Sequence, residues 1–120
     1  MNFVHPTADI SPDFVIPTGC FLDRNVRISH GVFADVGMLV MDGANIGHGL
    51  RCEEFCSFGP KCAVSGNCIF GGFVQIGVGA VTLLNADVAS GVRVAPNSVV
   101  YRSIKCSDSS WLGNPARRMR

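Results

Sequence analysis

The chain has 120 residues, a length typical of a single domain, and 48% of them are apolar, which excludes a disordered tail. Only 16% are charged and the formal net charge is +1, which excludes a strongly basic nucleic-acid-binding protein. The first six residues lack a basic start followed by an apolar run. We therefore expect no signal peptide, and we expect the six cysteines to be reduced thiols in a cytoplasmic protein.

A period of six residues organises the chain almost from its start. Every sixth residue from Val4 to Val100 is apolar, apart from Thr82. A second column, four positions later throughout, is just as regular. Each second-column residue precedes the next first-column residue by two, which is the spacing of side chains on one face of a strand. The two columns therefore predict short strands that each point two side chains into a common core.

A corner position follows each first-column residue by three. Of its seventeen members, from Thr7 to Ser103, twelve are Gly, Asn or Asp, the residues that tolerate positive φ. Short strands with a corner every six residues wind into a parallel β-helix, with three hexads and eighteen residues in each coil. The expected all-β fold is therefore a β-helix of hexapeptide repeats with five to six coils. The corners at Phe55, Lys61 and Phe73 lack such a residue, and we expect them to differ in shape.

The stretch between Cys62 and Ala86 carries no charge and is long enough to suggest a membrane span. It also contains several glycines and the polar side chains Asn67, Gln75 and Asn85, which are poor material for a membrane helix. The period of six continues through it unchanged, so we assign it to the β-helix and expect no membrane contact.

The hexads end near residue 105. We therefore divide the chain into a β-helix at 1–105 and a C-terminal tail at 106–120. Because the open end of a β-helix exposes strand edges, we expect the tail to pack on the last coil.

Two histidines occupy equivalent corner positions one coil apart. His48 should project from the prism, and His30 lies eighteen residues earlier, so the two should stack at a backbone spacing of about 4.8 Å. His30 and His48 could in principle bind a metal ion together. The spacing of the three histidines in the sequence does not match that of a known metal site, so we expect no metal. The inward columns also hold five cysteines, which we expect to fill the core: Cys20, Cys52, Cys56, Cys62 and Cys68.

Several motifs resemble one known family. They are the uninterrupted hexads, Val4-His5-Pro6-Thr7-Ala8, Ile46-Gly47-His48, Phe58-Gly59-Pro60, Gly66-Asn67 and the terminal Gly113-Asn114-Pro115-Ala116-Arg117. Over nearly the whole chain they resemble the left-handed β-helix acyltransferases, nearest to bacterial sialic-acid O-acetyltransferases and bacillosamine-type amino-sugar N-acetyltransferases. The resemblance implies a left-handed helix, a homotrimer, and acetyl-CoA lying in a cleft between neighbouring subunits.

The resemblance also assigns roles to residues. His48 matches the base that takes the acceptor's proton, and the Gly66 N–H faces the thioester carbonyl, where it would stabilise an oxyanion. Glu53 or Glu54, from the same or a neighbouring subunit, is our candidate to orient His48. The other cofactor-binding positions follow the family's pantetheine cleft or the basic C-terminal end, which suits the phosphates of CoA: Asn67, Val78, Ala95, Pro96, Arg117 and Arg118. For the two arginines a solvated basic tail remains the alternative.

The sequence departs from the family in three ways. The nearest families carry a nucleotide-fold domain before the β-helix, whereas here Met1 stands directly before the first coil. His48 lies between Gly47 and Gly49 rather than beside an acid, and Ser57 stands where a second histidine is common. We predict an acetyl-CoA-dependent acetyltransferase that acts on a hydroxyl or amine of a sugar or related small molecule. The alternative is a non-catalytic trimeric β-helix for binding or assembly.

Overall fold

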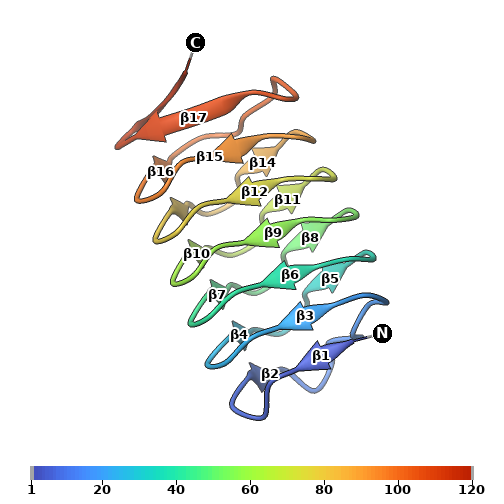
Figure 1. Cartoon of the computed structure of the whole chain (residues 1–120). Helices are drawn as coiled ribbons and strands as arrows, with labels where there is room; N and C mark the ends of the chain where they lie inside the picture. Colours follow the sequence, from blue (N-terminus) through green and yellow to red (C-terminus); the bar gives the residue numbers. More distant parts are fainter. Residues whose placement is uncertain (1, 120) are drawn as a thin grey trace.

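The computed structural model describes residues 2–119, in which two-residue strands and tight corners alternate along most of the chain (Figure 1). The strands form three sheets that make the sides of a rod about 39 Å long. This arrangement confirms the parallel β-helix, with about six turns and no helix among the described residues. No segment within residues 2–119 is a helix long and apolar enough to cross a membrane.

The first sheet has eight strands, and the second and third have six and four. In spatial order the first contains β1 (Phe3–Val4), β3 (Phe21–Leu22), β6 (Leu39–Val40), β9 (Ser57–Phe58), β12 (Gln75–Ile76), β15 (Arg93–Val94), β17 (Ser110–Gly113) and β18 (Ala116–Arg118). The second contains β2 (Asp9–Ile10), β4 (Arg27–Ile28), β7 (Asn45–Ile46), β10 (Ala63–Val64), β13 (Val81–Thr82) and β16 (Val99–Val100). The third contains β5 (Phe33–Ala34), β8 (Arg51–Cys52), β11 (Ile69–Phe70) and β14 (Asp87–Val88).

Parallel pairing keeps a constant register along most of the rod. Phe3 pairs with Phe21 in the first sheet, and Asn45 pairs with Ala63 in the second, each eighteen residues on. Residues eighteen apart therefore lie one above the other, at the strand spacing of about 4.8 Å. A position on one corner can be followed from coil to coil by adding eighteen to its number.

The two apolar columns point inward from the second coil onward, and the five cysteines of these columns are all buried, as expected. The first coil is the exception, because the inward-column residues Val4 and Ile16 are 38% and 39% exposed. No strand forms at residues 15–16, so the third sheet begins only at β5. The following residue is Pro17, which has no N–H to donate to the coil above.

The corners at Phe55, Lys61 and Phe73 have the same conformation as the glycine corners, so the expected difference in shape is wrong. Their φ angles are 56°, 58° and 60°, against 67–76° at the corner glycines from Gly19 to Gly91. Stacked coils impose this turn, since the Phe55 N–H donates to the Val36 carbonyl at 2.9 Å in the coil below. A left-handed φ costs an ordinary residue roughly 1–2 kcal/mol. Here the Phe55 and Phe73 rings stack with centroids 5.4 Å apart, which offsets part of that cost.

The tail forms the end of the rod. Strand β17 pairs in parallel with β15, but Ser110 lies opposite Arg93, seventeen residues earlier rather than eighteen. The chain then turns back as β18, antiparallel to β17, through a cis Asn114–Pro115 bond. The Gly113 N–H donates to the buried Ser98 hydroxyl at 3.0 Å, which fastens this hairpin to the last full coil.

Candidate active site

His48 lies at the corner where the second sheet turns into the third. We call this edge the histidine corner; it contains residues 11–13, 29–31, 47–49, 65–67, 83–85 and 101–103 in successive coils. Ile46 ends β7 with its side chain fully buried, and Gly49 turns the chain with a φ of 73°. His48 lies between them on the outside of the turn and is exposed, so its imidazole faces outward as predicted.

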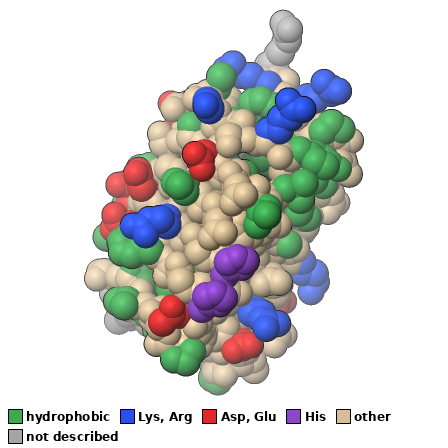
Figure 2. All heavy atoms as spheres, turned by 180° about the vertical axis from the view of Figure 1, so that it is seen from behind, with side chains coloured by type: hydrophobic (Ala, Val, Ile, Leu, Met, Phe, Trp, Pro, Cys, Tyr) green, Lys and Arg blue, Asp and Glu red, His purple; other side chains and the backbone are tan. Residues whose placement is uncertain are grey.

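One face of the His48 ring is covered by His30. The two ring centroids are 5.4 Å apart and the planes differ by 10°, which confirms the expected stack. Figure 2 shows the two imidazoles as adjacent side chains on one face of the molecule.

The other face of the ring lies against Gly66, one coil further along. A Cβ atom on Gly66 would be 2.4 Å from His48 Cε1 and 2.6 Å from Nε2. The φ of Gly66 is not in the left-handed region, and the equivalent position one coil later is Leu84, so the turn itself accepts a side chain. A side chain at 66 would displace the imidazole, which occupies that space.

Gly66 also offers a hydrogen-bond donor beside the imidazole. Its carbonyl accepts from the Asn85 N–H at 3.0 Å, whereas its own N–H donates to no backbone carbonyl within residues 2–119. A backbone N–H of this kind can stabilise a developing negative charge on oxygen. An imidazole and a backbone N–H without a backbone acceptor among residues 2–119 therefore stand in successive coils of one corner.

Asn67 fixes the residue that follows His48. The Asn67 N–H donates to the His48 carbonyl at 2.8 Å, and the Asn67 Oδ1 atom would lie 2.3 Å from a Cβ on Gly49. An acidic side chain at position 49 would meet this amide unless the amide moved. The glycine after His48 thus makes room for the Asn67 side chain.

Neither candidate acid reaches His48 within one chain. Glu53 and Glu54 lie at the next corner, and a carboxylate oxygen of Glu54 lies against Gly72. No side-chain or backbone group among residues 2–119 forms a hydrogen bond with the His48 ring. The contacts of the imidazole are the His30 ring on one side and the Gly66 backbone on the other.

The residues expected to line a pantetheine cleft lie on a different edge. Val78, Ala95 and Pro96 belong to the corner where the first sheet turns into the second. Ala95 and Pro96 border a groove of about 530 Å³ that runs over the first sheet to Trp111. One chain does not bring this groove and His48 together.

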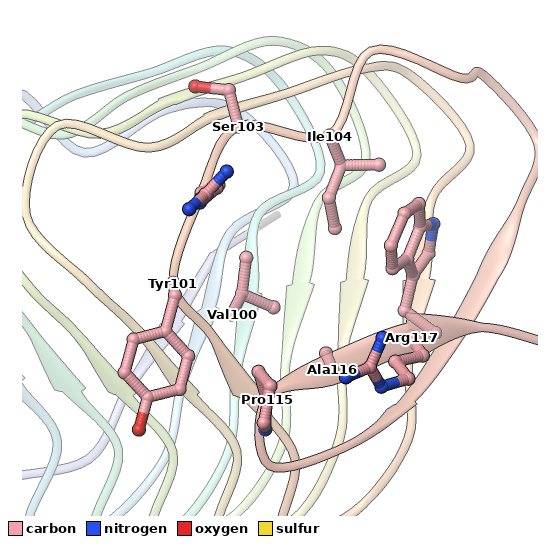
Figure 3. Close-up of a pocket in the computed structure, with 9 residues that line it drawn as sticks. Val100, Tyr101, Ser103, Ile104, Pro115, Ala116 and Arg117 are labelled. Carbon is pink, nitrogen blue, oxygen red and sulfur yellow. The ribbon is translucent and has the colours of Figure 1, made fainter.

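The larger hollow lies at the C-terminal end of the rod. Residues 100–104 and the β17–β18 hairpin enclose about 590 Å³ (Figure 3), and we call this hollow the end pocket. Arg117 lines it together with Arg102 and Trp111, whereas Arg118 does not. Arg102 belongs to the basic C-terminal end of the sequence but was not among the expected cofactor-binding residues. It stands 54 residues after His48, which is three coils further along the histidine corner and roughly 14 Å along the rod at about 4.8 Å per coil.

The other possible metal ligands and nucleophiles do not form a second site among the described residues. No group of three His, Cys, Asp or Glu residues within 2–119 could hold a metal ion. Burial raises the pKa of the Cys20 thiol to about 11 and that of Cys62 to about 12, so neither is a nucleophile near neutral pH. Cys106 is the exposed thiol.

No protein-family model and no curated protein matches the sequence. Among solved structures, the acetyltransferase domain of PglB from Neisseria gonorrhoeae is 27% identical with a TM-score of 0.94, and the match covers 99% of this chain and 58% of that one. A histidine variant of GDP-perosamine N-acetyl transferase from Caulobacter crescentus, in complex with CoA and GDP-perosamine, is 25% identical with a TM-score of 0.94, covering 99% and 56%. WeeI from Acinetobacter baumannii has the same fold at 20% identity and a TM-score of 0.93, covering 97% and 57%.

These neighbours confirm the resemblance found in the sequence. They include sugar N-acetyltransferases of the hexapeptide-repeat type, and the fold of the chain is their left-handed β-helix. The PglB domain has also been solved with acetyl coenzyme A. The chain spans somewhat more than half the length of the chains it matches.

Proposed function

We propose that this chain is an acetyl-CoA-dependent acetyltransferase that acylates a hydroxyl or amine of a sugar or related small molecule. The observation that carries the proposal is the contact between the His48 ring and Gly66, where an imidazole lies next to a residue whose N–H has no backbone acceptor among residues 2–119. Neighbours that are 25–27% identical over nearly the whole chain, and that were solved with CoA or acetyl-CoA, support the same chemistry.

The mechanism is direct transfer. His48 accepts the proton of the acceptor hydroxyl or amine as that group attacks the thioester carbonyl carbon. The Gly66 N–H faces the carbonyl oxygen, which becomes negative in the tetrahedral intermediate. When the carbon–sulfur bond breaks, the thiolate of CoA takes the proton from His48, so the base is regenerated without a covalent enzyme intermediate.

The cofactor would follow the histidine corner toward the end pocket. With the thioester at Gly66, Arg102 stands two coils away, roughly 10 Å along the rod, and Arg117 faces the same pocket. The two guanidinium groups suit the phosphates of CoA. We place Arg118 and the Asn67 amide beside this path.

The groove bordered by Ala95 and Pro96, on the corner that also holds Val78, enters the proposal through a second subunit. Because it lies on another edge of the prism, it faces the His48 edge only when two copies pack side by side. A homotrimer with three shared sites of this kind satisfies both sets of residues. The six free thiols fit a cytoplasmic location.

A non-catalytic module for binding or assembly is the competing function. One observation favours it, because the His48 ring has no hydrogen-bond partner among residues 2–119. Calorimetry with acetyl-CoA separates the two functions, since a module of that kind does not bind the cofactor.

The experiment combines binding and turnover. We expect acetyl-CoA to bind, and we expect Arg102→Ala to weaken binding about tenfold or more, whereas Lys105→Ala, which lies at the same end but outside the pocket, leaves it unchanged. Turnover is measured as CoA release with a panel of nucleotide-linked amino sugars that includes GDP-perosamine. Absence of acetyl-CoA binding to the wild-type protein contradicts the proposal.

A further inference from the structure

We propose that His30 is a positioning residue, which holds the His48 imidazole in its working orientation by stacking against it. The expected effect on turnover rests on the proposed acetyltransferase function. The expected effect on the orientation of the His48 ring does not depend on that function. A base must keep its nitrogen aimed at the acceptor, and enzymes commonly achieve this with a hydrogen bond to the second ring nitrogen. Here no such partner exists among residues 2–119.

Stacking takes the place of that hydrogen bond. The His48 ring is enclosed between the His30 ring, parallel to within 10° at 5.4 Å, and the backbone of Gly66, whose missing side chain the ring replaces. A tilt of the ring toward Gly66 meets the backbone of that residue, and a tilt the other way turns it toward the His30 ring. The two neighbours therefore limit tilting of the ring out of its plane.

His30 can serve as a support because its own turn is anchored. The Asp13 carboxylate accepts the N–H of Gly31, the residue after His30, at 2.8 Å. The Ser11 hydroxyl donates to the same carboxylate. The His30 carbonyl accepts the Gly49 N–H at 3.0 Å, which ties this turn to the turn of His48. His30, His48 and Gly66 thus stack in one column, and Asp13 anchors the turn that carries His30.

His30 differs from the other neighbours of the His48 ring because its own side chain is a planar ring. Gly66 touches the ring only through its small backbone, and Gly49 supplies no side chain that could reach the imidazole. His30 is the planar group in contact with His48, so what it provides is a flat surface at the right height. Phenylalanine at position 30 offers the same surface without a titratable nitrogen, whereas alanine offers none.

The test compares His30→Ala, His30→Phe and a matched control. Phe55→Ala removes an aromatic ring from a stack of the same 5.4 Å spacing, at another corner and one coil further along than His30. Ring motion is measured by 13C relaxation at Cε1 of His48, which needs neither an acceptor nor acetyl-CoA. Turnover is measured as kcat and as KM for acetyl-CoA, and folding is checked by thermal melting.

We expect the order parameter of the His48 Cε1–H bond to be near that of rigid backbone, about 0.85, in the wild-type protein, His30→Phe and Phe55→Ala. In His30→Ala it should fall below about 0.6. Turnover should follow, with kcat reduced about tenfold in His30→Ala and restored in His30→Phe, while KM for acetyl-CoA stays within about twofold.

A His48 ring that remains as ordered in His30→Ala as in the wild-type protein overturns the proposal. So does a loss in His30→Phe equal to that in His30→Ala, because a flat ring would then not be the essential property. If the wild-type protein fails to bind acetyl-CoA, the proposed function fails, and the relaxation measurement still decides whether His30 positions His48.

Discussion

Replacing Gly66 with alanine tests whether the contact between the His48 ring and the next coil matters for activity. A Cβ at this position would approach His48 Cε1 to 2.4 Å, and ordinary contact begins near 3.4 Å, so the ring must move by about 1 Å. A displacement of about 1 Å at a reacting group can reduce turnover about 10²-fold. The Gly66 N–H itself is retained, so the loss reports on the position of the base.

The substitution should leave the fold intact. The φ of Gly66 is not in the left-handed region, and Leu84 occupies the same turn position one coil on with its side chain 58% exposed. An unstrained Gly→Ala change stabilises a protein by about 0.4–1 kcal/mol through the unfolded state, and the displaced ring offsets part of this gain. We therefore expect the free energy of unfolding to stay within about 1 kcal/mol of the wild-type value.

The assay is steady-state CoA release with a productive acceptor, or slow thioester hydrolysis until one is found, together with thermal melting. The control is the same change in a His48→Ala background, where the space for a Cβ is already free. In that background Gly66→Ala should cause no further loss of activity. Undiminished kcat in a folded Gly66→Ala protein, or an equal loss in both backgrounds, refutes the reasoning.

The remaining predictions concern catalysis, the core, pH and assembly. His48→Ala should lower kcat about 10²–10⁴-fold with little change in acetyl-CoA affinity, and full activity would contradict its role as the base. Cys62→Ser should destabilise by about 1–3 kcal/mol in urea unfolding. Cys56→Ser should cost less, because the thiol at 56 already donates to the Gly71 carbonyl at 3.1 Å and a hydroxyl can do the same. Hydrogen bonds from the Ser11 hydroxyl and the Gly31 N–H hold the pKa of Asp13 below 3.8, so its stabilisation is present above pH 3.8 and is lost as the pH falls through the lowered value. The melting temperature of Asp13→Asn should therefore lie below that of the wild type at pH 7 and converge with it in acid. Light scattering should give about 38 kDa, three times the 12.7 kDa chain, and a stable monomer at micromolar concentration would exclude a shared site.

The sequence alone determined the coil, because a β-helix depends on local periodicity. Two inward side chains in each hexad and a turn residue at each corner fix where the chain bends, and the register of eighteen follows from three hexads. Adding eighteen to a residue number was therefore enough to place His30 beneath His48, and the same step leads from His48 to Gly66, which the resemblance alone had pointed to. The same addition leads from His48 to Arg102, so this signal was present in the sequence and unused.

Contacts between coils were decided by the tertiary structure. Phe55 and Phe73 adopt a left-handed turn because hydrogen bonds from stacked coils impose it, which no local propensity indicates. Residues 15–16 keep the apolar period but form no strand, since pairing with the coil above also needs a donor at the next residue, where the chain has Pro17. The hairpin of β17 and β18, and the end pocket it encloses, depend on a last coil that is one residue short. The periodicity of the sequence specifies the repeated coil. Specific contacts between side chains and backbone decide the ends of the rod, the position of the His48 ring and the shape of the end pocket.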